Sequence, residues 1–389
     1  VVTISATASD NVGVFGVQFK LDVANVGNED IVAPYSVFWN TTNTSNGIHV
    51  LSATARDAAG NSANSTPVSV IVNNTQPGIE EQIEIIGLTA PTNIVFLPDG
   101  RRLITEKGGI IKVFLPGKTA PETPSFLSIS NINVQGESGL LGITIDPNFA
   151  TNSYYYVFYS AQTPILDRVS RFTANGNQTN ISTELILWQD NNAATGLHEH
   201  RGGAIIVSSN QLYFTVGDHF EPSTVQSLTS YYGKVLRINL DGSIPSDNPY
   251  YDGAGPNLDE IWAIGLRNPY RMSYDMASGR IFIGDVGGAS VEEINLGVGG
   301  ANYGWPICEG PCGNPGMTNP LYSYTHDGKS AAVTAGMVYR GTQFPHVGNL
   351  FYGDYAQGWI KRLLFNSSGD VTASLDFWPP AGQSQYIGA

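Results

Sequence analysis

The sequence predicts an all-β protein in which a small N-terminal β-sandwich precedes a larger β-propeller. The composition favours this fold class, because the 389 residues include 44 Gly and 22 Pro but only 13% charged residues. That balance is typical of short strands joined by tight turns. No long segment of the sequence has the i, i+3, i+4, i+7 apolar period of an amphipathic helix. Strand–turn–strand units also recur through the second part of the chain, which indicates a repeated architecture.

Residues 1–75 alternate apolar and polar side chains in short runs such as "VFGVQFKLD" and "HVLSATARD". The turn signals "SDNVG", "TSNG" and "DAAGN" separate these runs at the spacing of a small β-sandwich. We expect Asp57 and Asn61 to satisfy backbone groups of a turn. Residues 76–84 are polar and predict a short linker, so the second domain is expected to cover residues 85–389.

Residues 85–389 repeat a strand, a turn carrying Asp, Asn or Gly, and a second strand rich in aromatic or β-branched residues. Examples are "PTNIVFLPDGRRLITEKGGIIKVF" and "YRMSYDMASGRIFIGDVGG". A hairpin that cannot bury both faces alone predicts blades stacked around an axis, which is the architecture of a β-propeller. The segments "LHEHRGG", "GDHFEP", "GLRNPYR" and "GDVGGAS" lie at equivalent ends of their repeats. We therefore expect them to meet in one pocket.

The net charge of −14 argues against nucleic-acid binding, since only 19 Lys and Arg are spread over the chain. Electrostatic attachment to an anionic membrane is disfavoured for the same reason. The sequence contains no run of 18 or more apolar residues, so it predicts no membrane-spanning helix. The N-terminus "VVTISATASD" begins as a strand and lacks the features of a signal peptide. Either a leader has been removed or the chain is a fragment.

Cysteine usage and glycosylation motifs favour an exported protein, at the cell surface, outside the cell or in a periplasm. The spacing of Cys308 and Cys312 in a Gly/Pro loop fits a small disulfide loop, and two thiols alone cannot complete a zinc site. N-x-Ser/Thr motifs are common by chance in a chain this rich in Asn, Ser and Thr, so they support export without establishing it. The candidate glycosylation sites are Asn40, Asn43, Asn64, Asn73, Asn177, Asn180 and Asn366.

The polar segments contain side chains suited to proton transfer and anion binding. His200 is a candidate general base, because a neutral imidazole accepts a proton near neutral pH, and Glu199 beside it could orient the ring or a substrate hydroxyl. Arg267 and Asn268 offer a cationic fork and an amide, which suit an anionic or quinone-like oxygen. The backbone carbonyls of residues 287–288, with carboxylates close by in the chain, suit a hard cation such as calcium.

Each of these residues also has a purely structural interpretation. A lone His in a loop that enters a strand is usually structural, and Arg267 could be a partner in a core salt bridge. Zinc hydrolysis through His198 and His200 is a third interpretation, since side chains two residues apart on a strand point to the same face. No third ligand is evident in the sequence, so this interpretation is the weakest.

Several longer motifs follow one another in the chain, including "VFLPDGRRLITEKGGIIKVF", "GESGLLGITIDPNFATNSYYYVFYS", "YYGKVLRINLDGSIPSDNPY", "IWAIGLRNPYRMSYD" and "NYGWPICEG". Their serial order resembles that of the soluble PQQ-dependent glucose and aldose sugar dehydrogenases. The similarity covers residues 85–365, and the Hedgehog-interacting-protein propeller belongs to the same superfamily. It implies a six-bladed-type propeller with PQQ (pyrroloquinoline quinone) on its axis, held partly through calcium. Residues 1–75 resemble bacterial immunoglobulin-like modules, particularly in "GIHVLSATARDAAGNSA".

The resemblance assigns roles to residues of the expected pocket. His200 matches the base that removes the proton of a sugar hydroxyl while hydride passes to the quinone. Glu199 and Glu137 match positions that contact the substrate. The implied activity is therefore the oxidation of an aldose, with a small-molecule sugar and an electron acceptor as partners.

The resemblance also assigns residues to the cofactor and to metal. Arg267 matches the arginine that stabilises negative charge on the reduced quinone, and Asn268 matches a neighbouring cofactor contact. The pair Gly287 and Gly288 matches residues whose carbonyls bind the calcium that holds PQQ. Glu293 and Tyr303 lie where some members of the family hold a second, structural calcium.

Departures from the family pattern keep a non-catalytic function open. Ala356 or Gln357 stands where the family has a basic anchor for PQQ, and Ala204 stands where many members have Arg or Gln. The sixth strand–turn–strand repeat, with its arginines, is absent after "WIKRLLFNSSGD". The last blade is therefore expected to be missing or incomplete. The alternative is an extracellular binding or structural glycoprotein that uses the propeller as a scaffold, with homo-assembly or surface contact through the immunoglobulin-like module.

Overall fold

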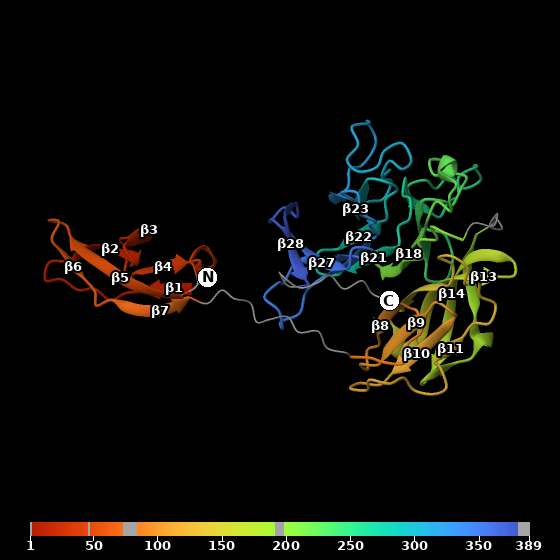
Figure 1. Ribbon diagram of the computed structural model, residues 1–389, viewed down its shortest axis with the longest axis horizontal. Coiled ribbons are helices and arrows are strands. Elements are labelled where there is room, and N and C mark those ends of the chain that lie inside the picture. Colours follow the sequence, from red (N-terminus) through yellow and green to blue (C-terminus); the bar gives the residue numbers. More distant parts are fainter. Residues whose placement is uncertain (1, 46, 73–83, 191–197, 380–389) are drawn as a thin grey trace. The chain divides into compact units, whose positions relative to one another are not determined.

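The structure, a computed structural model, describes residues 2–45, 47–72, 84–190 and 198–379. The chain divides into two compact units, Val1–Glu81 and Gln82–Ala389, and both are built almost entirely from strands (Figure 1). The α-helix α1 (Phe149–Asn152) is a single turn, so the all-β fold class predicted from the sequence is confirmed. The predicted linker, residues 76–84, lies outside the described residues except for Glu84.

The first unit contains two sheets that pack across a small apolar core. A two-stranded sheet pairs β1 (Val2–Ser5) with β4 (Ser36–Trp39). The second sheet contains β2 (Val14–Leu21), β3 (Ala24–Asp30), β5 (Gly47–Asp57), β6 (Ser62–Asn64) and β7 (Val68–Val72). Val17, Phe19, Tyr35 and Ala53 form the buried centre. As expected for a turn, Asp57 accepts hydrogen bonds from the backbone and the side chain of Asn61.

The second unit contains five sheets in its described part, each formed by strands that follow one another in the chain. The first sheet contains β8 (Pro91–Phe96), β9 (Arg102–Glu106), β10 (Ile110–Phe114) and β11 (Leu127–Ser128). The second contains β12 (Leu140–Ile145), β13 (Tyr154–Gln162), β14 (Ile165–Asn175), β15 (Gln178–Thr179) and β16 (Leu185–Gln189). The third contains β17 (Ile205–Ser208), β18 (Gln211–Val216), β19 (Lys234–Asn239) and β20 (Ile261–Ile264).

The fourth and fifth sheets complete the series. The fourth contains β21 (Arg271–Asp275), β22 (Arg280–Asp285), β23 (Val291–Leu296) and β24 (Tyr322–Thr325). The fifth contains β25 (Val333–Val338), β26 (Leu350–Asp354), β27 (Trp359–Phe365) and β28 (Val371–Trp378). The first strand of each sheet contacts the first strand of the next, in the order β8, β12, β17, β21 and β25. This arrangement is the radial packing of propeller blades.

Apolar side chains hold adjacent sheets together because each inner strand is buried on both faces. Along β13, Tyr155 and Val157 pack into the core shared with the first sheet, whereas Tyr156 and Phe158 pack into the core shared with the third. All four side chains are fully buried. Successive side chains of a strand point to opposite faces, so an unbroken aromatic and β-branched run is what two-sided burial requires.

Two ends of the second unit can be defined from strand direction. At the site end, the first strand of each sheet begins and the second strand stops. The opposite end contains the turns that connect the first strand of each sheet to the second, and the third strand to the fourth. Within the described ranges, no helix is long and apolar enough to cross a membrane.

Candidate functional site

The site end of the third and fourth sheets collects the polar segments singled out in the sequence. His200 lies just before β17 and Asp218 just after β18. Arg267 and Asn268 precede β21, and residues 286–290 follow β22. Hydrogen bonds join these segments directly, including one from the Asp218 amide to the Arg267 carbonyl at 2.7 Å. The polar segments that the sequence predicts to meet therefore lie together, although they are up to 90 residues apart in the chain.

His200 and Asp218 form a buried imidazole–carboxylate pair. The His200 Nδ1 lies 2.7 Å from Asp218 Oδ1, and both side chains are nearly excluded from solvent. Asp218 also accepts bonds from the Phe220 amide (2.9 Å) and the Trp305 indole N–H (2.9 Å). Burial opposes ionisation of Asp218, but the hydrogen bonds from His200, Phe220 and Trp305 outweigh it and hold the pKa of Asp218 below the ordinary value. A carboxylate on Nδ1 fixes the tautomer in which Nε2 is the proton acceptor.

The backbone around His200 takes an uncommon conformation to place the ring there. His200 has a φ of +53°, a region that L-residues adopt only when their surroundings enforce it. Gly217 permits this arrangement, because a Cβ at Gly217 would lie 2.0 Å from the His200 carbonyl oxygen. The Phe220 ring packs on the imidazole with ring centroids 4.0 Å apart. The imidazole is thus held on one face by an aromatic ring and at Nδ1 by a carboxylate.

Glu137 braces the pair from the second sheet. Its Oε2 accepts bonds from the His200 amide (2.8 Å) and from the Asn268 side-chain amide (3.0 Å). The Asn268 Oδ1 in turn accepts a bond from the Gly202 amide at 3.0 Å. Glu137 and Asn268, which the resemblance assigns to substrate and cofactor, therefore also connect the loops of three sheets. Glu199 is partly exposed, and no hydrogen bond or ion pair of its side chain is found among the described residues.

Arg267 is anchored through its backbone and covers the glycine loop with its side chain. Its amide donates to the buried Asp285 carboxylate at 2.9 Å. Burial and the nearby Glu293 charge raise the pKa of Asp285 well above its ordinary value. The Arg267 Nη1 donates to the Gly287 carbonyl at 2.6 Å and to the Val286 carbonyl at 3.0 Å. The Gly287 oxygen that was expected to bind calcium is thus hydrogen-bonded to arginine in this structure.

A carboxylate missed by the sequence analysis organises the same loop. Glu309 Oε1 accepts four successive backbone N–H bonds, from residues 288, 289, 290 and 291, at 2.8–3.0 Å. Burial opposes ionisation of Glu309, but these four bonds together lower its pKa. Successive N–H groups that converge on one anion form a backbone nest. Glu309 belongs to the small loop that the Cys308–Cys312 disulfide closes.

The two residues expected at a second calcium site have other partners. Glu293 accepts bonds from the Gly310 amide (2.7 Å) and the Asn295 side chain (3.0 Å), and burial raises its pKa. The Tyr303 hydroxyl donates to the Leu296 carbonyl at 2.7 Å and accepts from the Val298 amide. In the ranges that the structure describes, no group of three or more His, Cys, Asp and Glu side chains is arranged to hold a metal. His198 contacts the Asn133 side chain at 3.0 Å.

A second buried polar cluster lies behind the His200–Asp218 pair. Asp167 on β14 has no exposed surface and lies 3.3 Å from Arg201 and 3.2 Å from His219. Its other oxygen accepts the Ser160 hydroxyl at 2.6 Å. Arg201 and His219 directly follow His200 and Asp218 in the chain. The cluster therefore anchors both loops that carry the His200–Asp218 pair. Because it depends on a long-range contact with β14, it could not be recognised from the local sequence.

The side chains at the site end fit a planar anionic cofactor at one edge. Trp305 lies beside Arg267, and the guanidinium carbon of Arg267 is 5.6 Å from the centroid of the Trp305 ring. A Cβ at Gly288 would come within 3.2 Å of Trp305 and 3.6 Å of Arg267 Nε, so the missing side chain leaves this face flat. Lys107, between β9 and β10, supplies a second cation at the same end and donates to the Gly136 carbonyl. A flat face beside the Arg267 cation suits a fused-ring quinone with carboxylates.

The chain belongs to the Glucose / Sorbosone dehydrogenase family, which matches residues 88–382. Residues 1–53 match the Bacterial Ig domain family. The chain is 28% identical over 279 residues to quinoprotein glucose dehydrogenase B of Acinetobacter calcoaceticus, covering 63% of this chain and 56% of that relative. It is also 28% identical over 312 residues to the aldose sugar dehydrogenase YliI of Escherichia coli, with 78% and 75% covered.

Further comparisons support the fold and widen the range of relatives. The PQQ-bound form of the aldose sugar dehydrogenase from Streptomyces coelicolor superposes with a TM-score of 0.61 at 21% identity, covering 76% of this chain and 83% of that one. This likeness shows the propeller fold. Human Hedgehog-interacting protein is 27% identical over 223 residues, which cover 49% of this chain and 31% of that protein. The predicted family resemblance and its Hedgehog-interacting branch are thus confirmed.

The candidate glycosylation sites lie at the surface wherever the structure describes them. Asn40, Asn43, Asn64, Asn180 and Asn366 are exposed and Asn177 is half-buried, whereas Asn73 lies outside the described residues. The Asn177 Oδ1 accepts a bond from Arg101, and the Asn180 side chain caps the 3₁₀ turn at Ile181–Thr183. A glycan at either of these two positions would have to leave those contacts intact.

Proposed function

We propose that the protein is an exported PQQ- and calcium-dependent sugar dehydrogenase that oxidises an aldose hydroxyl. The observation that carries this proposal is the buried His200–Asp218 pair, because it leaves Nε2 as the proton acceptor. Membership of the family and the two dehydrogenase relatives support the same activity. Export is supported by the disulfide and by the exposed glycosylation motifs.

His200 is the general base of the proposed reaction. Its Nε2 takes the proton of the sugar hydroxyl, and Asp218 stabilises the imidazolium that forms, since its carboxylate is already bonded to Nδ1. Glu199 has a carboxylate available to a sugar hydroxyl. Glu137 holds the His200 amide, so that the ring keeps its position as its charge changes.

Arg267, Gly288, Trp305 and Lys107 would hold the cofactor. When bound, PQQ supplies a two-electron acceptor for the hydride that leaves the substrate carbon as its C–O bond becomes C=O. Arg267 would stabilise negative charge there. For calcium to bind the carbonyls of Gly287 and Gly288, the Arg267 Nη1 would first have to leave the Gly287 oxygen. An external electron acceptor completes the cycle.

The test is reconstitution of the full chain with PQQ and calcium, followed by dye reduction with a panel of aldoses. We expect activity in the wild type, a loss of about 10²–10⁴-fold in His200→Asn, and no loss in the control His49→Gln. His49 lies in the first unit, where it contacts Asp22. Absence of both activity and a PQQ-induced absorbance change would refute the proposal.

The second candidate function is a non-catalytic extracellular scaffold, favoured by the similarity to Hedgehog-interacting protein. It predicts a folded chain that does not bind PQQ. It also predicts that His200→Asn changes stability without changing any binding property of the protein. Size-exclusion chromatography with light scattering would then test homo-assembly.

A further inference from the structure

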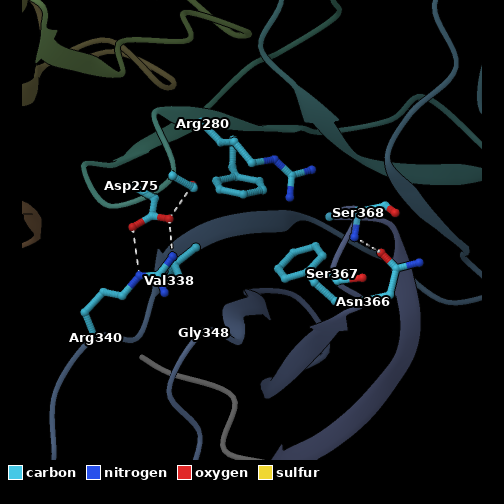
Figure 2. Close-up of a pocket in the computed structure, with 12 residues that line it drawn as sticks. Asp275, Arg280, Val338, Arg340, Gly348, Asn366, Ser367 and Ser368 are labelled. Carbon is cyan, nitrogen blue, oxygen red and sulfur yellow. Dashed lines mark hydrogen bonds and ion pairs between the residues drawn. The ribbon is translucent and has the colours of Figure 1, made fainter.

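A cleft lies at the opposite end of the second unit, between the fourth and fifth sheets. Its volume is about 310 Å³, and its walls come from the turn after β21, the start of β22 and the turn between β27 and β28 (Figure 2). Strand direction separates it from His200, because β22 begins at the cleft and ends at Asp285 in the candidate site. Nothing in the proposed dehydrogenase mechanism uses this cleft.

Arg280 presents an unneutralised charge to the cleft. Its guanidinium carbon lies 5.1 Å from the ring centroids of both Phe282 and Phe365. Among the described residues no hydrogen bond or ion pair engages it. Two aromatic rings hold a guanidinium in place and leave its N–H donors available. The side chain is therefore oriented before any ligand arrives.

The other charged groups of the cleft neutralise each other. Arg340 donates through Nε and Nη2 to the two oxygens of Asp275, with the Nε bond at 3.0 Å. The bond from Arg340 lowers the pKa of Asp275 to about 2, so the pair stays ionised and mutually compensated at neutral pH. Asp275 is the one carboxylate among the residues that line the cleft. Among the residues that line the cleft, Arg280 is the one whose charge is not compensated by a partner.

The turn between β27 and β28 places further donors next to Arg280. Gly369 has a φ of +86°, and a Cβ there would lie 3.0 Å from Arg280 Nη1, so glycine allows the guanidinium to approach the turn. Ser367 and Ser368 line the cleft, and no hydrogen bond of either hydroxyl is found among the described residues. Figure 2 shows both serines across the cleft from Arg280.

We propose that this cleft binds an oxyanion through Arg280, with the Ser367 and Ser368 hydroxyls as additional donors. A guanidinium with hydroxyl donors beside it suits the oxygens of a carboxylate, sulfate or phosphate. A volume of about 310 Å³ exceeds the needs of an inorganic ion and matches the small end of ligand pockets. A sugar acid has both the carboxylate and the size to occupy the cleft. Inorganic sulfate would pair with the Arg280 charge but would leave most of the volume empty.

The test is calorimetric titration of the full chain with sodium glucuronate, sodium sulfate and neutral glucose, at constant ionic strength. We expect saturable binding of glucuronate and at least a ten-fold weaker Kd in Arg280→Gln. Arg280→Lys retains the charge and should lose less. The matched control is Arg171→Gln on β14, where the guanidinium stacks 4.1 Å from the Tyr154 ring centroid.

The two anions distinguish the sources of the oxyanion. Glucuronate binding without sulfate binding supports a sugar acid, and binding of both at the Arg280 site supports an oxyanion site of broad specificity. Sulfate binding alone supports an inorganic ligand. The proposal is overturned if neither anion binds, if glucose binds as well as glucuronate, or if Arg280→Gln and Arg171→Gln weaken binding equally. These outcomes are independent of PQQ and of dehydrogenase activity.

Discussion

Replacing Asp218 with Asn tests the proposed mechanism most directly. The introduced asparagine has nearly the same size, but its amide can donate a hydrogen bond to the His200 Nδ1, where the Asp218 carboxylate now accepts one at 2.7 Å. The imidazole then prefers the tautomer with its proton on Nε2, which cannot accept a proton from a sugar. Because general-base catalysis contributes about 10²–10⁴-fold, we expect a fall in kcat of that size, equivalent to roughly 3–5 kcal/mol.

The assay is dye reduction by the PQQ- and calcium-loaded chain, together with ¹⁵N NMR of its six His side chains. The NMR spectrum should show the His200 tautomer change even without cofactor. Asp354→Asn is the matched control. Asp354 also comes directly after a Gly where the second strand of a sheet stops, but it accepts bonds from the Tyr324 hydroxyl (2.7 Å) and from backbone amides. It should lower stability without changing the His200 signal. An Asp218→Asn variant with wild-type kcat and an unchanged tautomer would refute the reasoning.

Three further variants test other parts of the structure. Glu309→Ala leaves four amides without their acceptor and should lower the free energy of unfolding by about 1–3 kcal/mol in urea titration, with Glu309→Gln less affected. Burial lowers the pKa of Lys234 to about 7, below its unfolded value. Wild-type stability should therefore rise above pH 7, with a slope that approaches about 1.4 kcal/mol per pH unit by about pH 8–9, and Lys234→Met should lack this rise. Gly217→Ala forces the His200 carbonyl to move and should cost about 1–3 kcal/mol and reduce activity, whereas Gly313→Ala, with no atom within 4 Å of the added Cβ, should be neutral.

The acid side of the pH profile follows from Asp218. Its folded pKa lies below its unfolded value, so the stability it contributes is complete above the unfolded pKa and is lost as the pH falls through the folded pKa. Asp218→Asn should therefore remove part of the acid-induced loss of stability. This measurement needs neither cofactor nor substrate.

Strand periodicity made the fold predictable from sequence. The run "YYYVFY" in β13 predicts burial on both faces, and its side chains divide alternately between two cores. The turn signals around "LPDGRR" and "MASGR" mark hairpins that the structure contains at Leu97–Arg101 and Asp275–Arg280. Local pattern was sufficient here because each sheet is formed from strands consecutive in the chain.

Long-range partners were not predictable in the same way. Trp305 donates a hydrogen bond to a residue 87 positions away in the chain, and Glu309 accepts hydrogen bonds from residues about 20 positions away. No local sequence pattern around Trp305 or Glu309 indicates these partners. Asp167 contacts Arg201 and His219 only because β14 passes behind the site. The partners of these side chains depend on which segments meet in the folded protein, and the periodicity of the sequence predicts strands but not those meetings. One of the missed residues, Asp218, did carry a signal in the sequence.

The dipeptide Gly-Asp recurs where the second strand of the third, fourth and fifth sheets stops. Asp285 accepts the amides of the segment entering β21, and Asp354 accepts the Ala332 amide before β25. At the equivalent position in the third sheet, Asp218 bonds an imidazole, and His200 takes a left-handed conformation beside Gly217. A purely structural protein could hold this loop through hydrogen bonds to backbone amides, as the fourth and fifth sheets do, without the cost of that conformation. Of the three Gly-Asp positions, only the one in the third sheet has a histidine against its aspartate, and the left-handed backbone of that histidine favours a catalytic role over a purely structural one.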